Sequence, residues 1–334
     1  MFQFDQGQIG TLTPSPCSNP VPPVPIPWAY VKISDGCSRH CSYCTIPSIR
    51  GPYHSYSFEA IINEVESLVA QGAREIILVG QDTGIWSAPE KPQNLAELLN
   101  SLASAYPQTW FRVMYLQPEG ITDELLAVMA QHANIARYLD IPLQHASAEI
   151  LASMNRKGSG KEYLELVSRI REALPGVVLR TTVMVGYPGE SPEDYNELCA
   201  FIEAACFDYV GIFVYSPEEG TAAAALSRQI DEETAKERLQ ELRDKADLIG
   251  FERADRQLGQ RTEVLICGQD EEGVYGRTKG QAPDVDGITY LYVPNDAGAL
   301  TLLPDKTPPG TVVQVTISET VLYDLFAEIT TETQ

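Results

Sequence analysis

The hydrophobic positions of residues 28–216 form short apolar runs that alternate with stretches of helical periodicity. The runs predict six strands, at residues 30–34, 75–80, 111–115, 137–142, 178–186 and 209–215. Short apolar runs of this kind are typical of parallel strands that are covered on both faces. The stretches between them predict helices at residues 58–71, 95–105, 122–131, 161–173 and 192–205. The alternation therefore predicts an α/β domain.

Two further patterns follow this domain. Residues 231–257 are charged, and their apolar positions recur every three or four residues, at Leu239, Leu242, Ala246 and Ile249. This spacing predicts one connecting helix. Beyond it, short strands are predicted at residues 263–267, 273–277, 289–293, 312–318 and 322–329. Short strands separated by turn residues predict a small all-β module, most simply a five-stranded barrel.

The chain of 334 residues is too long for one ordinary core, which predicts two domains and a tail. Six strand–helix units are too few for a closed eight-unit barrel. We therefore expect an open six-unit (β/α) partial TIM barrel, with its chemistry at the carboxyl ends of the strands. Residues 1–28 hold seven prolines and few apolar anchors, which predicts an extended linker. The expected order is a linker at 1–28, the partial barrel at 29–230, the helix at 231–257 and the β module at 258–330.

The composition favours a soluble protein. No apolar stretch is long enough to span a bilayer and nothing resembles a secretory signal, so we expect a cytoplasmic protein with reduced thiols and no membrane partner. The net charge is −22. This charge argues against nonspecific affinity for nucleic acid or anionic membranes and favours a basic partner.

Three cysteines lie within eight residues, at Cys37, Cys41 and Cys44, between the first predicted strand and a helical stretch. One short loop with this spacing can place its three sulfurs around one face of a cubane iron–sulfur cluster. Such a cluster normally takes four cysteine thiolates. Three ligands leave one iron open, and an open iron can chelate a small molecule and pass it an electron. That is the chemistry of radical enzymes that use S-adenosylmethionine (SAM).

A structural zinc site is the main alternative for these cysteines. Zinc usually draws on two separated Cys/His pairs, but here Cys41 would belong to both spacings. His40 could complete four ligands, although four nearly adjacent residues would strain the loop. A zinc-stabilised binding module therefore stays open as an alternative. The remaining cysteines of the predicted domains are interpreted as small buried apolar residues: Cys199, Cys206 and Cys267.

Polar residues near the first two strands are candidates for binding SAM. Tyr43 precedes the third cysteine and could offer a flat face to the adenine, or simply pack under the loop. Gly80, Gln81 and Asp82 end the second predicted strand. There, a glycine allows close backbone approach and polar groups can receive an amino group.

The later strands carry further candidates. Gln144 and His145 end the fourth predicted strand and are expected to point at the barrel mouth. Arg180 lies on the fifth strand, where a guanidinium inside a barrel needs an anion. A SAM carboxylate would suit it, and a structural ion pair is the alternative. Gly186 and Glu190 follow that strand and could line the ribose or form a plain turn.

Together, the motifs of residues 30–328 resemble those of the radical-SAM methylthiotransferases. The resemblance is carried by Cys37 to Cys44 with Ile46-Pro47 and Arg50-Gly51, by Arg180-Thr-Thr with Gly186-Tyr-Pro-Gly-Glu190, and by a β module similar to a TRAM domain. Residues 140–147, 215–221, 281–287 and 323–328 resemble the branch that modifies a ribosomal protein. The tRNA-modifying branch typically has Gln-Ser-Gly where Gln144, His145 and Ala146 stand here.

The resemblance implies one four-iron cluster held by the three cysteines, SAM as cosubstrate, and an electron donor such as flavodoxin or ferredoxin. The reduced cluster would cleave SAM to a 5′-deoxyadenosyl radical, which removes hydrogen from the β-carbon of an aspartate in small-subunit ribosomal protein twelve before a methylthio group is installed. Family members carry, ahead of the barrel, a domain with three cysteines for a second cluster. The proline-rich run stands there in this sequence. We therefore expect one cluster and SAM cleavage, with complete methylthiolation and a second cluster only if that domain is supplied.

The charge of the β module bears on the substrate. Residues 258–334 hold four basic and twelve acidic residues, a net charge of −8. A module that binds RNA through phosphates should be basic, whereas an acidic one suits a cationic ribosomal protein. A tRNA methylthiotransferase and a non-catalytic factor that binds the ribosomal protein are the two alternatives left open.

Overall fold

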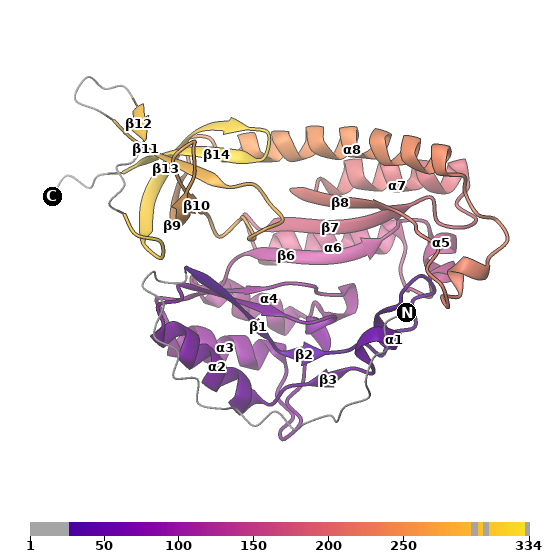
Figure 1. Ribbon diagram of the computed structural model, residues 1–334, viewed down its shortest axis with the longest axis horizontal. Coiled ribbons are helices and arrows are strands. Elements are labelled where there is room, and N and C mark those ends of the chain that lie inside the picture. The colour runs from indigo at the N-terminus through magenta and orange to yellow at the C-terminus, as the bar shows by residue number, and fades with distance from the viewer. Residues whose placement is uncertain (1–26, 295–299, 303–306, 331–334) are drawn as a thin grey trace, which may run out of the picture.

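The computed structural model describes residues 27–294, 300–302 and 307–330. Six parallel strands form an open barrel (Figure 1). They lie in two three-stranded sheets, β1 (Trp28–Lys32), β4 (Glu75–Val79) and β5 (Trp110–Val113), then β6 (Tyr138–Gln144), β7 (Val178–Val185) and β8 (Tyr209–Val214). A parallel bridge between Phe111 and Ile135 joins the sheets, so the spatial order follows the chain order. The predicted six-unit partial barrel is confirmed, whereas most of the predicted linker lies outside the described residues.

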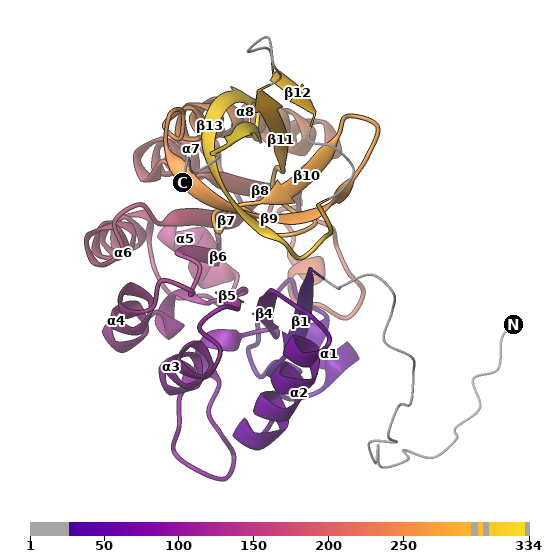
Figure 2. The same ribbon diagram turned by 90° about the vertical axis from the view of Figure 1, so that its left-hand side faces the viewer.

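Helices cover the outer face of this barrel (Figure 2). They are α2 (Phe58–Ala70), α3 (Leu95–Ala105), α4 (Asp123–Gln131), α6 (Gly160–Ala173) and α7 (Pro192–Ala205). Their starts are capped, as at Ser191, whose side chain accepts a hydrogen bond from the Asp194 backbone amide ahead of a first-turn proline. These five helices match the predicted ones.

Several short elements were not predicted, because two to six residues carry too little periodicity to stand out. They are the hairpin β2 (Ser34–Asp35) and β3 (His54–Ser55), the helices α1 (Ile46–Arg50) and α5 (Ala148–Ser153), and the 3₁₀ turns η1 (Thr83–Ile85), η2 (Pro118–Gly120) and η3 (Ala223–Ala225). The hairpin and α1 flank the three cysteines. These small elements therefore matter most for the site.

A long helix, α8 (Glu232–Asp255), connects the barrel to the β module, and its predicted apolar stripe packs on the barrel core. The module contains β9 (Arg261–Gln269), β10 (Val274–Arg277), β11 (Thr289–Pro294), β13 (Val312–Val321) and β14 (Asp324–Ile329). It closes into the predicted five-stranded barrel because β10 pairs with both β9 and β11. A further short strand, β12 (Leu300–Leu302), pairs with β11 and was not predicted. None of the described helices is both long and apolar enough to cross a membrane.

The module docks against the amino-terminal ends of the barrel strands, through a loop of residues 278–288 that follows β10. A buried carboxylate, Glu75 at the start of β4, accepts hydrogen bonds from Arg112 of β5 at 2.8 Å and from Arg277 of the module at 2.6 Å. Both guanidinium groups also donate to the Gln281 carbonyl. The module therefore closes one end of the barrel, on the left of Figure 1, and leaves the carboxyl ends beside α1 open on the right.

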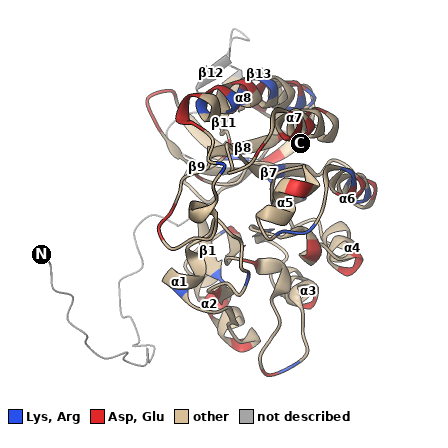
Figure 3. Ribbon diagram, turned by 90° about the vertical axis from the view of Figure 1, so that its right-hand side faces the viewer, with Lys and Arg blue, Asp and Glu red and all other residues tan. Residues whose placement is uncertain are grey.

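Acidic residues are spread over the outer helices and the β module (Figure 3). Helix α8 carries both signs of charge along its length.

Candidate cofactor site

The cysteines lie on a loop of residues 36–45 at the open end of the barrel, between the β2–β3 hairpin and α1. The loop begins at Gly36, whose φ of +72° is unfavourable for residues with a side chain. A Cβ added there would lie 2.3 Å from the Pro52 carbonyl oxygen. The Cys37 amide donates to the Gly51 carbonyl at 3.1 Å. The segments before and after the cysteines, at Gly36–Cys37 and Gly51–Pro52, are therefore in direct contact. This contact fixes the position at which the loop starts.

The three thiols are half-buried and line one cavity of about 780 Å³. Backbone amides point at two of the sulfurs: the Arg39 amide donates to Cys37 Sγ and the Ile46 amide to Cys44 Sγ, both at 3.4 Å. Burial raises the pKa of the Cys44 thiol, and the neighbouring Cys41 and Cys37 raise it further. The three sulfurs thus share one cavity, and the hydrogen bonds from backbone amides to two of them would stabilise thiolates.

A four-iron cluster fits this donor set. In the described part of the chain, no three His, Cys, Asp or Glu side chains converge as they would around one metal ion. A four-iron cluster takes each thiolate at a separate iron, so its ligands do not need to converge on one point. His40, the possible fourth zinc ligand, is exposed and does not line the cavity.

The cavity walls come from the carboxyl ends of several strands, as expected for a barrel site. Four of the SAM candidates from the sequence lie there with the cysteines: Tyr43, Gly80, Gln81 and Gln144. The Gln81 Oε1 atom is buried without a hydrogen-bond partner among the described residues. An unpaired buried acceptor is typical of an atom that accepts a hydrogen bond from a bound ligand. Two lining residues, Tyr115 and Gln144, have φ values of +62° and +74°. Such backbone strain is often found at functional sites.

Two of these four residues also have structural roles. Tyr43 packs against an apolar cluster that includes Ile150 and Met154, as the packing interpretation predicted, and its contact with adenine stays a prediction. At Gly80, an added Cβ would lie 2.3 Å from Ser34 Oγ. The glycine is therefore required by the close approach of β2 as well as by access to the cavity.

Arg180 is not among the residues that line the cavity, and the ion-pair alternative describes its observed contacts. Its guanidinium pairs with Asp286 of the β module at 3.1 Å and with Asp140 of β6 at 3.6 Å. Both carboxylates are buried, and burial raises the pKa of Asp140 to about 6 although Arg180 opposes this shift. The anion expected beside Arg180 is therefore provided by two carboxylates of the protein, those of Asp286 and Asp140.

Gly186 and Glu190 also lie away from the cavity, and the plain-turn alternative describes them better. The Gly186 amide donates to Glu190 Oε2 at 2.9 Å, and Glu190 Oε1 accepts from Arg238 of α8 at 2.5 Å. A Cβ on Gly186 would lie 2.7 Å from that of Ala235. The turn after β7 therefore packs against α8.

Asp82 and His145 are also not among the residues that line the cavity. Asp82 is buried and accepts a hydrogen bond from Arg39 Nε at 2.7 Å, so it orients a cavity residue, while its Oδ1 atom is buried without a hydrogen-bond partner among the described residues. His145 is fully buried, its Nδ1 accepts from the Ser147 amide, and its Nε2 lies 3.6 Å from Glu190. Its Nε2 is buried without a hydrogen-bond partner among the described residues.

The cavity is also lined by residues that were not predicted from the sequence as cofactor contacts: Tyr30, Lys32, Arg39, Ile46, Val79, Tyr115, Gln117 and Arg156. Tyr115 is the last residue of the third predicted strand and Gln117 follows it, so the rule that polar residues at strand ends face the barrel mouth, which found Gln81 and Gln144, could have found them as well. No local signal marks Arg39 or Arg156, because their neighbours in space lie far away along the chain.

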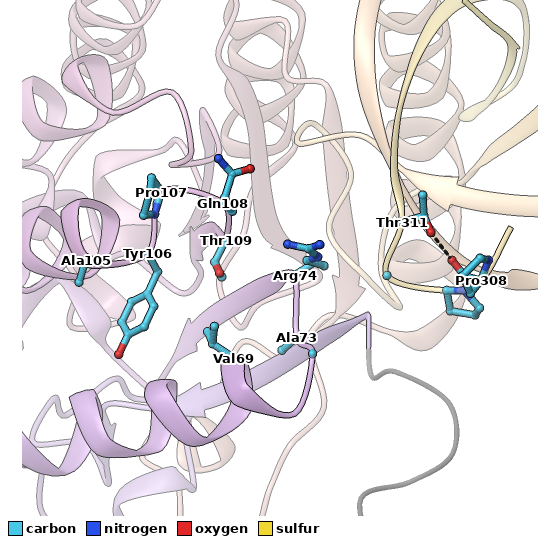
Figure 4. Close-up of a pocket in the computed structure, with 13 residues that line it drawn as sticks. Val69, Ala73, Arg74, Ala105, Tyr106, Pro107, Gln108, Thr109, Pro308 and Thr311 are labelled. Carbon is cyan, nitrogen blue, oxygen red and sulfur yellow. Dashed lines mark hydrogen bonds between the residues drawn. The ribbon is translucent and has the colours of Figure 1, made fainter. Parts of the chain in front are cut away.

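A second cavity, of about 610 Å³, lies between the barrel and the β module (Figure 4). It is lined by the turns that precede β4 and β5 and by residues 308–311 of the module. Its charged lining residue is Arg74, and none of the cysteines lines it. The candidate chemistry therefore belongs to the cysteine cavity.

Comparison with known proteins agrees with this geometry. Residues 31–202 match the model of the Radical SAM superfamily, and residues 258–330 match that of the TRAM domain. The solved structure of coproporphyrinogen III oxidase (HemN) from Escherichia coli, a radical SAM enzyme, has a TM-score of 0.52 and 16% identity, covering 69% of this chain and 55% of that one. This likeness concerns the fold alone.

Curated relatives are much more similar in sequence. A protein of Thermotoga sp. (strain RQ2) named ribosomal protein uS12 methylthiotransferase RimO is 41% identical over 305 residues, which cover 91% of this chain and 68% of the relative. A protein of the same name from Syntrophus aciditrophicus (strain SB) is 40% identical over 333 residues, which cover 98% and 69%. The chain thus spans about two thirds of the length of these relatives.

Proposed function

We propose that this chain, which belongs to the radical SAM superfamily and within it to the RimO-type methylthiotransferases, modifies ribosomal protein uS12. The proposed reaction adds a methylthio group to the β-carbon of an aspartate in that protein. Enzymes of this superfamily use a four-iron cluster and SAM. The observation that carries the proposal is the set of three thiols on one loop that line one cavity at the carboxyl ends of the barrel strands.

In this proposal Cys37, Cys41 and Cys44 bind one cluster. When bound, the cluster and SAM supply one-electron radical chemistry. The backbone amides of Arg39 and Ile46 stabilise two of the thiolates, because hydrogen bonds to cluster sulfurs favour their negative charge. Iron analysis should therefore give about four irons per chain for these three cysteines.

The remaining cavity residues bind SAM. Tyr43, Gly80, Gln81 and Gln144 are the proposed contacts, since all four line the same cavity as the thiols. A cavity of about 780 Å³ lies within the size range of ligand pockets. The β module, with its net charge of −8, is proposed to attract the basic ribosomal protein.

The activity test uses anaerobically reconstituted protein, dithionite, SAM and purified uS12. We expect 5′-deoxyadenosine to form in this mixture. We expect uS12 to gain the mass of one methylthio group on an aspartate only when a domain with the second cluster, the source of the sulfur, is also supplied. A flavodoxin or ferredoxin can replace dithionite in a second series. If no 5′-deoxyadenosine forms, the chain is not the enzyme proposed here. If tRNA were modified and uS12 were not, the substrate assignment would be wrong.

The loop geometry leads to a separate prediction for Gly36→Ala. The new Cβ would lie 2.3 Å from the Pro52 carbonyl oxygen and 2.7 Å from that of Gly51, and these backbone atoms cannot move aside cheaply. We expect iron content to fall by about 10- to 100-fold, as when the support of a metal ligand is lost. Gly176→Ala is the matched control, because Gly176 has a φ of +77° and open space around its Cβ position. Equal iron content in both variants would show that the start of the loop does not position the cysteines.

A further inference from the structure

Three cations line the cysteine cavity, and they differ in what neutralises them. Lys32 pairs with Asp35 at 3.1 Å, and Arg39 pairs with Asp82 at 2.7 Å and with Glu119 at 3.3 Å. The hydrogen bonds of Arg156 in the described part of the chain instead go to neutral oxygens. Its Nη2 donates to Gln117 Oε1 at 2.6 Å and to the Pro142 carbonyl at 2.7 Å.

The Nε of Arg156 is also buried, and among the described residues it has no hydrogen-bond partner. A partly buried guanidinium with a buried, unsatisfied Nε donor and neutral acceptors on its other nitrogens is costly, so such a group usually faces an anion. The position of Arg156 in the cavity wall therefore indicates that the anion comes from a bound group.

The segment that carries Arg156 is attached to the cysteine loop on both sides of Cys41. The side chain of Asn155 donates to the His40 carbonyl at 2.8 Å, and the Ser42 amide donates to the Met154 carbonyl at 3.1 Å. The Ser42 hydroxyl also donates to the Ser153 carbonyl at 2.9 Å. These bonds bring Arg156 beside Cys41. Arg156 and Cys41 also line the same cavity.

We propose that Arg156 is a positioning residue, whose guanidinium faces the Cys41 thiolate of the bound cluster and raises the cluster's reduction potential. The inference rests on the proposed function, because it needs a cluster at the three cysteines. Its physical basis is charge: reduction adds one electron, so a nearby, partly buried cation stabilises the reduced form more than the oxidised form. Hydrogen bonds to cluster sulfurs and net charge are established determinants of such potentials.

The experiment measures the midpoint potential of the reconstituted cluster in the absence of SAM, by redox titration followed by electron paramagnetic resonance. At a given applied potential, we expect Arg156→Met to have at least a tenfold lower ratio of reduced to oxidised cluster, about 59 mV for a one-electron couple. Arg156→Lys keeps the charge and should recover most of this loss. The control is Arg74→Met, which removes the same charge from an exposed site in the cavity of Figure 4 and should change the ratio less than twofold.

The outcomes separate this inference from the proposed function. If the wild-type protein binds no iron, both fail. If its cluster forms and Arg156→Met titrates like the wild type, only the role of Arg156 is wrong. A loss of SAM affinity at unchanged potential also overturns it, because the arginine would then serve the SAM carboxylate. Should Arg156→Met lose its cluster, Arg156→Gln, which keeps a donor for the Pro142 carbonyl, is held to the same tenfold expectation.

Discussion

Replacing Cys41 with alanine is expected to lower both the iron content of the reconstituted protein and its SAM cleavage by more than about 100-fold. The reason is that loss of a supporting residue alone already costs about 10- to 100-fold in metal affinity, and loss of a ligand costs more. Cys37→Ala and Cys44→Ala should behave alike, because all three thiols line one cavity. The measurements are iron and sulfide analysis, visible absorption, and chromatography of 5′-deoxyadenosine.

Two controls make this prediction specific. Cys206→Ala removes a half-buried thiol from the end of α7 and should leave iron content and SAM cleavage unchanged. His40→Ala tests the zinc alternative, since a Cys₃His zinc site would need that side chain. We expect the His40 variant to keep its cluster, because His40 is exposed and does not line the cavity. A colourless protein that loses bound zinc in the His40 variant would contradict the cluster.

The barrel strands and long helices could be predicted because each carries its own local pattern. Strand β4 is an example: Ile76, Ile77 and Leu78 are consecutive and all buried, as the apolar run indicated. The elements that were not predicted are too short to show a hydrophobic periodicity. Examples are the two-residue strands of the β2–β3 hairpin and the three-residue strand β12. Pairing with a distant partner decides these elements, and sequence periodicity does not report it.

The site could be predicted where its residues are neighbours in the sequence or lie at the ends of predicted strands. The cysteine loop is contiguous, and Gln81 and Gln144 end strands whose carboxyl ends must meet in a barrel. Arg180 shows the limit. Its need for an anion was correctly inferred, but the partner Asp286 lies 106 residues later in the β module. Where a buried charge finds its partner depends on how the domains dock.

That docking leads to the second large effect, which is expected for Glu75→Gln. Glu75 and Arg112 are fully buried, and Arg277 is nearly so. Removing the carboxylate charge would leave two guanidinium groups inside the protein with no anion, and breaking a buried pair in this way costs about 3–5 kcal/mol. We expect the free energy of unfolding, measured by denaturant titration with circular dichroism, to fall by about that amount.

The pH dependence should have the matching sign. Burial alone would raise the pKa of Glu75, but Arg112 and Arg277 outweigh it and lower the pKa below its usual value. A carboxyl group whose pKa is lower in the folded state contributes stability above the pKa of the unfolded chain. This contribution is lost as the pH falls through the folded-state pKa, and Glu75→Gln should lack that part of the acid dependence.

A second substitution distinguishes uncompensated charge from lost packing. In the double variant Glu75→Gln, Arg277→Met, one of the two unpaired cations is gone, so stability should partly recover relative to the single variant. Glu203→Gln is the surface control, because the exposed Glu203–Lys245 pair is screened by solvent and its loss should leave the unfolding midpoint unchanged. If Glu75→Gln unfolds at the wild-type denaturant concentration, or if the double variant is less stable than the single one, charge balance at this junction does not hold the β module to the barrel.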